Sequence, residues 1–250
     1  MKLKKPLAGV SRRQLLVWSG TALVSYQAHA VTIKGVPAWQ PFDDSPPETF
    51  DQAGYLFLNT LEVATLTAIV DQLIPADELS PAGSECGCVV FIDRQLHGFY
   101  GNFERLYREG PFEKGTPEQG DQSPLTPRQR YRIGLAALEA HSQSSYKKSF
   151  HAITSQQQLD LLKNLETGEI NFSEISGKEF FDQLLLNTTE GFFADPLYGG
   201  NREMVSWNML GFPGARYDYR DYIHQHNKDL NLYPVSITGA PEWDQQGKSS

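Results

Sequence analysis

The 250-residue sequence contains little cysteine and no long uninterrupted run of apolar residues. Its two cysteines, Cys86 and Cys88, stand in the string Cys-Gly-Cys. Covalent haem attachment needs C-x-x-C-H and an iron–sulfur cluster normally needs four thiolates, so neither pattern is present. Because a C-x-C disulfide closes a strained ring, we expect two small, partly buried thiols at a helix start; a bridge to another chain is the alternative.

The short motifs of common catalytic and nucleotide-binding sites are also absent: no G-x-G-x-x-G, phosphate-binding loop or G-x-S-x-G occurs. His224 and His226 share a face only in an extended backbone, so we interpret them as a solvated pair rather than metal ligands. The adjacent acids Asp77 and Glu78 point apart in most backbones, which favours a surface turn. The sequence therefore predicts no catalytic residue, metal ligand or cofactor site in this chain.

Residues 1–30 have the composition of an export signal. Ser-Arg-Arg-Gln-Leu-Leu includes Arg12 and Arg13, a mild apolar stretch follows, and Ala28-His29-Ala30 is a small-x-small cleavage pattern. The apolar stretch is too short to span a membrane. Paired arginines directly before it favour a twin-arginine signal over a general-secretion signal, in which they would supply only positive charge. The twin-arginine route carries proteins that have already folded.

Cleavage after Ala30 would leave an acidic protein. Residues 1–30 contain five of the 22 Lys and Arg residues and none of the 30 Asp and Glu residues, which leaves 17 against 30 and a net charge of −13. This charge excludes nucleic acid or an anionic membrane surface as the expected partner. With no second apolar run of spanning length, we expect the mature chain to be soluble or held by another subunit.

The remaining sequence predicts an all-α fold. Residues 31–58 combine four prolines with scattered aromatics, which indicates an extended arm. From residue 59 onward we expect one domain of about five to six helices with long irregular connections. Asn59, Thr126, Thr154 and Ser176 are followed three residues later by Glu or Gln, the capping pattern of a helix start. We expect helices at 59–74, from about 84 to 98, from 126, at 154–168, 176–191 and 202–210.

The string GFFADPLYGGN, Gly191–Asn201, is rich in residues that set backbone shape but contains no base or nucleophile beyond one acid. Asp195 precedes a proline and should be extended. Gly199 and Gly200 permit positive φ, and Asn201 is a suitable N-cap for the 202–210 helix. We interpret this string as a loop built for shape rather than for chemistry.

Aromatic and arginine side chains gather in this loop and after it. Such residues anchor protein–protein interfaces because they bury a large area at low entropic cost. The alternative is that the tyrosines rim the protein's own core. We predict a partner surface made of Phe192, Phe193, Tyr198, Arg216, Tyr217, Tyr219, Arg220 and Tyr222.

Three strings carry a family resemblance: SRRQLL, the stretch Leu73–Gly101, and the stretch Gly191–Tyr222. With them the chain resembles the small (gamma, or third) subunit of bacterial membrane-bound gluconate 2-dehydrogenase. Similar small subunits accompany related glucose, fructose and sorbitol dehydrogenases. Cys86 and Cys88 depart from the small or apolar residues expected in the SECGC turn, so the resemblance implies no role for them.

The resemblance implies a complex in which other chains do the chemistry. A large flavoprotein of the glucose–methanol–choline oxidoreductase type would oxidise D-gluconate to 2-dehydro-D-gluconate with FAD. A multihaem cytochrome c subunit, carrying haem c, would pass the electrons to quinone. The small subunit would hold no cofactor and would support maturation and export of the flavoprotein through the twin-arginine translocase. It would then lie in the periplasm, associated with the cytoplasmic membrane through the complex.

Two other classes of function stay open at this point. One is a stand-alone periplasmic enzyme with an unrecognised site, using His224, His226 and an acid. The other is a binding module unrelated to redox chemistry.

Overall fold

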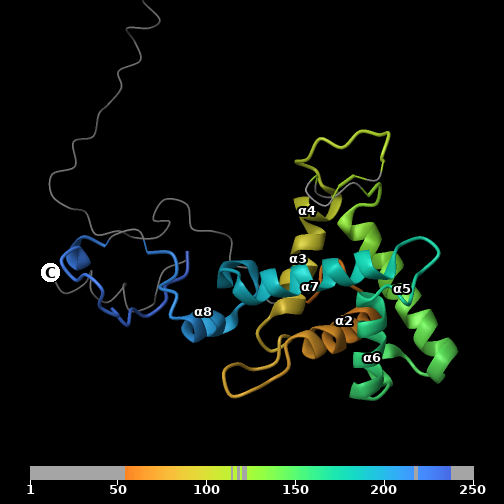
Figure 1. Cartoon of the computed structure of the whole chain (residues 1–250), viewed down its shortest axis with the longest axis horizontal. Helices are drawn as coiled ribbons and strands as arrows, with labels where there is room; N and C mark the ends of the chain where they lie inside the picture. The colour runs from red at the N-terminus through yellow and green to blue at the C-terminus, as the bar shows by residue number, and fades with distance from the viewer. Residues whose placement is uncertain (1–53, 114, 117–118, 120–122, 217–218, 238–250) are drawn as a thin grey trace, which may run out of the picture. The chain divides into compact units, whose positions relative to one another are not determined.

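The computed structural model describes residues 54–113, 115–116, 119, 123–216 and 219–237. These residues form seven α-helices and no β-strand, which confirms the all-α class (Figure 1). The arm before residue 54 and the leader with Arg12, Arg13, Ala28 and Ala30 lie outside the described residues. The α-helices are α2 (Thr60–Leu73), α3 (Cys88–His97), α4 (Phe99–Asn102), α5 (Pro127–Tyr146), α6 (Ser155–Glu166), α7 (Gly177–Phe193) and α8 (Val205–Leu210).

Local capping explains why most of these helices begin where the sequence predicts. At α2, the Asn59 side chain accepts from the Glu62 backbone N–H at 3.0 Å and the Glu62 carboxylate accepts from the Asn59 N–H at 2.9 Å. The same reciprocal pair starts α5 and α6. Ser176 caps α7 by accepting from the backbone N–H of Glu179. Each pair satisfies helix N–H groups that have no partner within the helix.

The second predicted helix begins four residues later than expected, at Cys88. Residues 84–87 form a turn instead, because the Asp71 carboxylate accepts from both the backbone N–H and the hydroxyl of Ser84. Gly87 then adopts φ +87°, which no helix accommodates. Gly98 separates α3 from the short α4, as the sequence indicates.

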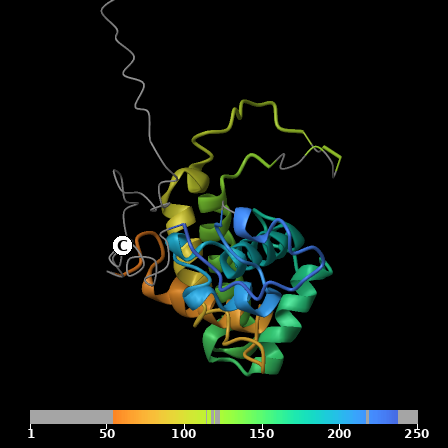
Figure 2. The same ribbon diagram turned by 90° about the vertical axis from the view of Figure 1, so that its left-hand side faces the viewer.

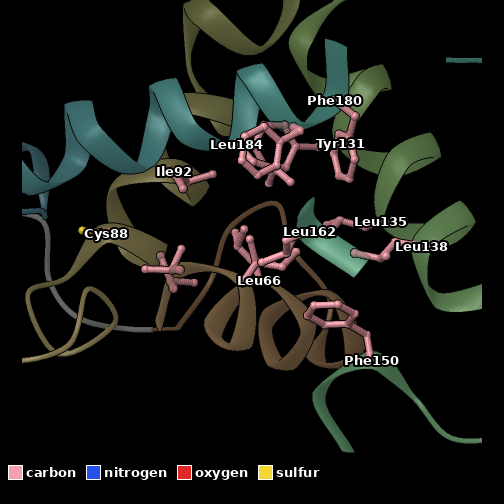
Figure 3. Packing of buried hydrophobic residues seen from close by; sticks show 14 of the residues in the cluster. Leu66, Cys88, Ile92, Tyr131, Leu135, Leu138, Phe150, Leu162, Phe180 and Leu184 are labelled. Atoms are coloured by element: carbon pink, nitrogen blue, oxygen red, sulfur yellow. The ribbon is translucent and has the colours of Figure 1, made fainter. Parts of the chain in front are cut away.

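The hydrophobic core lies around α7, which contacts α2, α3, α5, α6 and α8. Phe180 and Leu184 of α7 pack with Leu66 of α2 and Tyr131 of α5 (Figure 3). A Cβ at Gly134 would lie 2.4 Å from the Phe180 ring, so α5 and α7 approach closely only because position 134 has no side chain. No helix in this described part is long and apolar enough to cross a membrane.

A polar cluster at the edge of the core joins α4, α5 and α7. The Tyr131 hydroxyl donates to Asn187 Oδ1 at 3.1 Å, and Asn187 Nδ2 donates to the Tyr100 hydroxyl at 3.1 Å and to Glu190 at 2.9 Å. Buried phenols and amides are costly without partners, so these bonds allow Tyr131 to be fully buried and Tyr100 to be partly buried. Burial raises the pKa of both Tyr100 and Tyr131, so they act here as neutral hydrogen-bonding groups.

The long connection between α4 and α5 leaves the helices and returns to them (Figure 2). It exposes several aromatic and apolar side chains, including Tyr107, which is 88 % exposed. An arginine stacks on one of its rings: the Arg108 guanidinium carbon lies 4.2 Å from the Phe103 ring centre. Its described residues form no α-helix or strand, in agreement with the long irregular connections that the sequence predicts.

Asp93, in the middle of α3, holds the end of the N-terminal arm. Its carboxylate is fully buried and accepts the backbone N–H groups of Leu56, Phe57 and Leu58 at 2.7–2.9 Å. Arg94 donates to the same carboxylate and to the Gly54 carbonyl, both at 2.9 Å. A carboxylate saturated in this way stabilises the fold, because its removal leaves several buried donors unpaired.

We expect Asp93→Asn to lower the free energy of unfolding by about 2–4 kcal/mol, because the amide has one acceptor oxygen and turns an N–H₂ group toward backbone donors. Urea denaturation of the mature chain measures the change. Asp182→Asn is the matched control, since it removes the same charge from an exposed pair with Lys178 and should cost no more than about 0.5 kcal/mol. Equal effects of the two substitutions would contradict the anchoring role.

Candidate docking surface

Two backbone segments far apart in sequence meet at the amino end of α3. A Cβ at Gly87 would lie 2.4 Å from the carbonyl oxygen of Gly199, so neither a side chain nor a water fits between the 84–87 turn and the 191–201 loop. The Arg202 backbone N–H donates to the Cys86 carbonyl at 3.0 Å. Gly199, at φ +92°, also packs against Val90. The two glycine-containing strings that carry the family resemblance therefore form one structural unit.

The first residues of the predicted loop are helical. α7 continues through Gly191 to Phe193, two residues beyond its predicted end. Phe91 of α3 packs directly on Gly191. A Cβ at position 191 would lie 2.9 Å from the Phe91 ring, so this position of the helix has no room for a side chain. Gly200 in turn packs on the Gly191 carbonyl, where a Cβ would approach to 2.1 Å. The chain thus folds back on the end of α7 with no room for side chains.

Asn201 is not the N-cap that the sequence predicts. It has left-handed dihedrals, is fully buried and caps no continuous helix. Its Nδ2 donates to the Ala194 carbonyl at 2.9 Å, and its Oδ1 accepts from the backbone N–H and hydroxyl of Ser206 at 3.0 and 2.8 Å. A 3-10 turn (Arg202–Met204), with Glu203 at positive φ, therefore precedes α8. Asn201 holds the loop to α8 instead of starting a helix at 202.

Asp195 connects the same loop to the end of the described chain. It is extended before its proline, as expected, with φ −65° and ψ 136°. One carboxylate oxygen accepts from the Leu197 N–H at 2.9 Å and the other from the Ile237 N–H at 2.7 Å. Both oxygens of the one acid in the loop are thus used by the backbone, which supports a structural rather than a chemical role.

The segment from 211 onward returns to α8 through Trp207 and Val235. The Trp207 indole N–H donates to the Phe193 carbonyl at 3.0 Å, and its ring packs at 5.2 Å and 81° against Phe212. Gly214 forms an isolated bridge with the fully buried Val235. A Cβ at Gly214 would lie 2.2 Å from the Val235 carbonyl oxygen and 2.9 Å from the Trp207 ring. These contacts fix the C-terminal segment against α8.

The predicted partner residues occupy different environments. Phe192 is only 5 % exposed and belongs to the core, so in this structure it offers no surface to a partner. Arg216 donates to the Tyr233 carbonyl at 2.9 Å. Tyr217 lies outside the described residues. The others are exposed or half-buried at the surface: Phe193, Tyr198, Tyr219, Arg220 and Tyr222.

The sequence analysis missed further exposed side chains of the same region. Leu210, Phe212 and Tyr233 are 62 %, 47 % and 55 % exposed. Phe212 and Tyr233 line a cavity of about 500 Å³ formed by α8 and the C-terminal segment. We call this region, with Phe193, Trp207 and Tyr219, the docking surface. Its members lie 40 residues apart in sequence, and no periodicity marks them as one surface.

The groups considered for catalysis do not assemble. His224 and His226 are both exposed. Asp77 accepts the backbone N–H groups of Leu79 and Ser80, which lowers the pKa of its carboxyl and confirms a surface turn. Within the described ranges, no three His, Cys, Asp or Glu side chains come together in a way that could hold a metal ion.

The two cysteines are free and fully buried beside the junction of turn and loop. Desolvation raises the pKa of the Cys88 thiol to about 12, and desolvation together with the nearby Glu85 raises that of Cys86. Since the thiolate is the reactive form, both groups behave as small apolar side chains.

One comparison with known proteins identifies a family. The model of the family described as gluconate 2-dehydrogenase subunit 3 matches residues 60–214, which is 155 of the 250 residues. The chain therefore belongs to the gluconate 2-dehydrogenase subunit 3 family. No significant match occurs among curated proteins or solved structures.

Because both thiols are buried, we expect them to react slowly with thiol reagents in the native protein. With a pKa of about 12, only about one Cys88 thiol in ten thousand is ionised at pH 8. An aromatic disulfide reagent at pH 8 should therefore label neither cysteine on the timescale on which it labels both in guanidinium chloride. Rapid labelling of one native thiol would contradict the burial.

We expect Gly87→Ala to destabilise the protein more than Gly168→Ala. Both glycines have positive φ, but a Cβ at Gly168 meets open space while one at Gly87 meets Gly199. Gly168→Ala should therefore cost only the left-handed strain, about 1–2 kcal/mol. Gly87→Ala should cost about 1–3 kcal/mol more, because the loop must move. Denaturation midpoints of the two variants measure the difference; equal losses would show that the close approach contributes nothing.

Proposed function

We propose that this chain is the non-catalytic small subunit of a membrane-associated, FAD-dependent gluconate 2-dehydrogenase, and that it carries the folded flavoprotein through the twin-arginine translocase. The observation that carries the proposal is the family match over residues 60–214. Arg12 and Arg13 precede that match in a leader with the composition of an export signal. A related glucose, fructose or sorbitol dehydrogenase is the alternative complex.

The arrangement of polar groups supports a role in binding rather than catalysis. Asp195 and Asn201, the polar side chains on which the 191–201 loop depends, are engaged by backbone and hydroxyl partners. General acid–base chemistry needs a group that is free to exchange a proton with a substrate. The docking surface instead exposes aromatic and aliphatic side chains, the kind of surface that marks a protein–protein contact.

In this proposal the redox groups belong to the partner chains. FAD would be bound by a large subunit of the glucose–methanol–choline oxidoreductase type, and haem c by a multihaem cytochrome c subunit. Because FAD is inserted in the cytoplasm, the flavoprotein must cross the membrane folded, and a bound partner with a twin-arginine signal provides that route. The chain would then remain in the periplasm, attached to the membrane through the complex.

The double substitution Arg12→Lys with Arg13→Lys tests the carrier role. Lysine keeps the positive charge, but an ammonium cannot form the bidentate contacts of a guanidinium. We expect both this chain and the unaltered flavoprotein to remain in the cytoplasm, so that substrate-dependent dye reduction is lost from the periplasmic face of intact cells. Fractionation with antibodies to both proteins measures the distribution.

Lys4→Arg with Lys5→Arg is the matched control, since it exchanges the same two residue types outside the paired-arginine string. This control should leave export unchanged. Normal export of the flavoprotein in the Arg12→Lys, Arg13→Lys cells would show that the carrier role is wrong.

A further inference from the structure

We propose that the junction of the 84–87 turn with the 191–201 loop forms only while the thiols of Cys86 and Cys88 are reduced, and that the folded junction then protects both thiols from oxidation. The chain would therefore have to fold before it enters an oxidising compartment. This consequence for export rests on the proposed function, whereas the dependence of folding on the thiols concerns this chain alone.

Both cysteines are built into the junction. Cys86 is 1 % exposed, and its backbone carbonyl accepts the Arg202 N–H at 3.0 Å. Cys88 is fully buried at the first position of α3 (Figure 3). The two side chains belong to the hydrophobic core, and the residue between them, Gly87, makes the close approach to Gly199. A change at either sulfur therefore acts directly on the contact between turn and loop.

The packing around the sulfurs excludes a disulfide with another molecule. Thiol–disulfide exchange passes through a mixed disulfide, in which the partner is attached to the attacking sulfur. Cys86 and Cys88 are 1 % and 0 % exposed, and a close-packed interior has no space for such a group. The reactive thiolate is also scarce, because burial raises the pKa of the Cys88 thiol to about 12. Exchange at either cysteine therefore requires the junction to open.

A bridge between the two cysteines would also disturb the junction. It would close a ring around Gly87, whose φ of +87° and missing side chain allow the turn to touch Gly199. Disulfide geometry is specific, so a ring this short dictates the backbone dihedrals of the residue inside it. A Cβ at Gly87 would already lie 2.4 Å from the Gly199 carbonyl oxygen. The contact therefore has no free space in which a different backbone at Gly87 could be accommodated.

In the unfolded chain nothing hinders the same oxidation. The two cysteines are then hydrated, and they lie two residues apart in sequence. One thiolate attacks the disulfide of a carrier protein, the other displaces the carrier from the mixed disulfide, and the carrier leaves as a dithiol. Two electrons pass to the carrier and two protons are released. Because such carriers keep the bacterial periplasm oxidising, a chain that crossed the membrane unfolded would meet them before its junction formed.

Refolding of the purified chain tests the dependence on reduced thiols. The chain is unfolded in guanidinium chloride, kept reduced or oxidised with diamide, and then diluted. Circular dichroism should show native helix content in the reduced chain, and in the oxidised chain only after dithiothreitol is added. Diamide should consume the thiols of the native chain at least about a hundredfold more slowly than those of the unfolded chain.

The double substitution Cys86→Ala with Cys88→Ala is the control for refolding. Alanine removes both thiols and keeps small apolar side chains in the core. This variant should refold equally after either treatment.

An exchange of leaders tests the consequence for export in cells and needs no refolding in vitro. Residues 1–30 are replaced by a general-secretion signal, which delivers the chain unfolded to the periplasm. The wild-type chain should then be insoluble or degraded, with its thiols oxidised. The double alanine variant should give a soluble, protease-resistant chain. Thiol alkylation and immunoblotting of the periplasmic fraction measure both properties.

The outcomes separate this inference from the proposed function. Equal refolding of the oxidised and reduced wild-type chain would overturn the inference, as would a soluble wild-type chain with two free thiols after general secretion. Equal loss of the alanine variant and the wild type would overturn it too, because oxidation could not be the cause. Normal export of the flavoprotein in the Arg12→Lys, Arg13→Lys cells would overturn the proposed function and leave the refolding result unchanged.

Discussion

The close approach of Gly87 and Gly199 is the constraint on which the arrangement of the rest depends. Because the two backbones touch without side chains between them, the amino end of α3 is fixed against the chain leaving α7. Gly200 on Gly191 and Asn201 on Ala194 then direct the chain into α8. Trp207 and the C-terminal segment pack on that base through the Trp207 indole bond to the Phe193 carbonyl and the bridge between Gly214 and Val235.

The same ten-residue helix also holds the end of the N-terminal arm. Asp93 of α3 binds the backbone of residues 56–58, while the Gly87 turn at the amino end of α3 holds the 191–201 loop. At about 1.5 Å per residue, these positions lie within roughly 10 Å of one another along the helix axis. A chain whose core has not formed would hold neither its arm nor its docking surface, which suits a protein proposed to travel in a folded state.

The features predicted from sequence are those decided by neighbouring residues. The capping pairs at Asn59, Thr126 and Thr154 act over three positions, so the helix starts and the all-α class follow from local pattern. The features that sequence analysis missed or misplaced depend on distant partners. Asp93 binds groups 35–37 residues away, and Phe91 packs against Gly191 at the end of α7, where a side chain would not fit. Asn201 has the residue type of a cap but takes part in a buried network, and Phe192 has the residue type of an interface anchor but fills the core.

The 191–201 loop is rich in glycine and aromatic residues, yet the side chains of Asp195 and Asn201 bind the protein's own backbone and two of its aromatic rings face the surface. Such a loop need not be catalytic. Each glycine in it permits a close contact that a side chain would block, and both oxygens of Asp195 accept backbone N–H groups. With these polar atoms engaged internally, the loop exposes the rings of Phe193 and Tyr198, which the proposed partner contact would use. Such contacts depend on shape and buried area rather than on ionisation, and they are screened little by salt. In the proposed complex, such an apolar contact would hold the partner while the negative net charge of the chain discourages unspecific association.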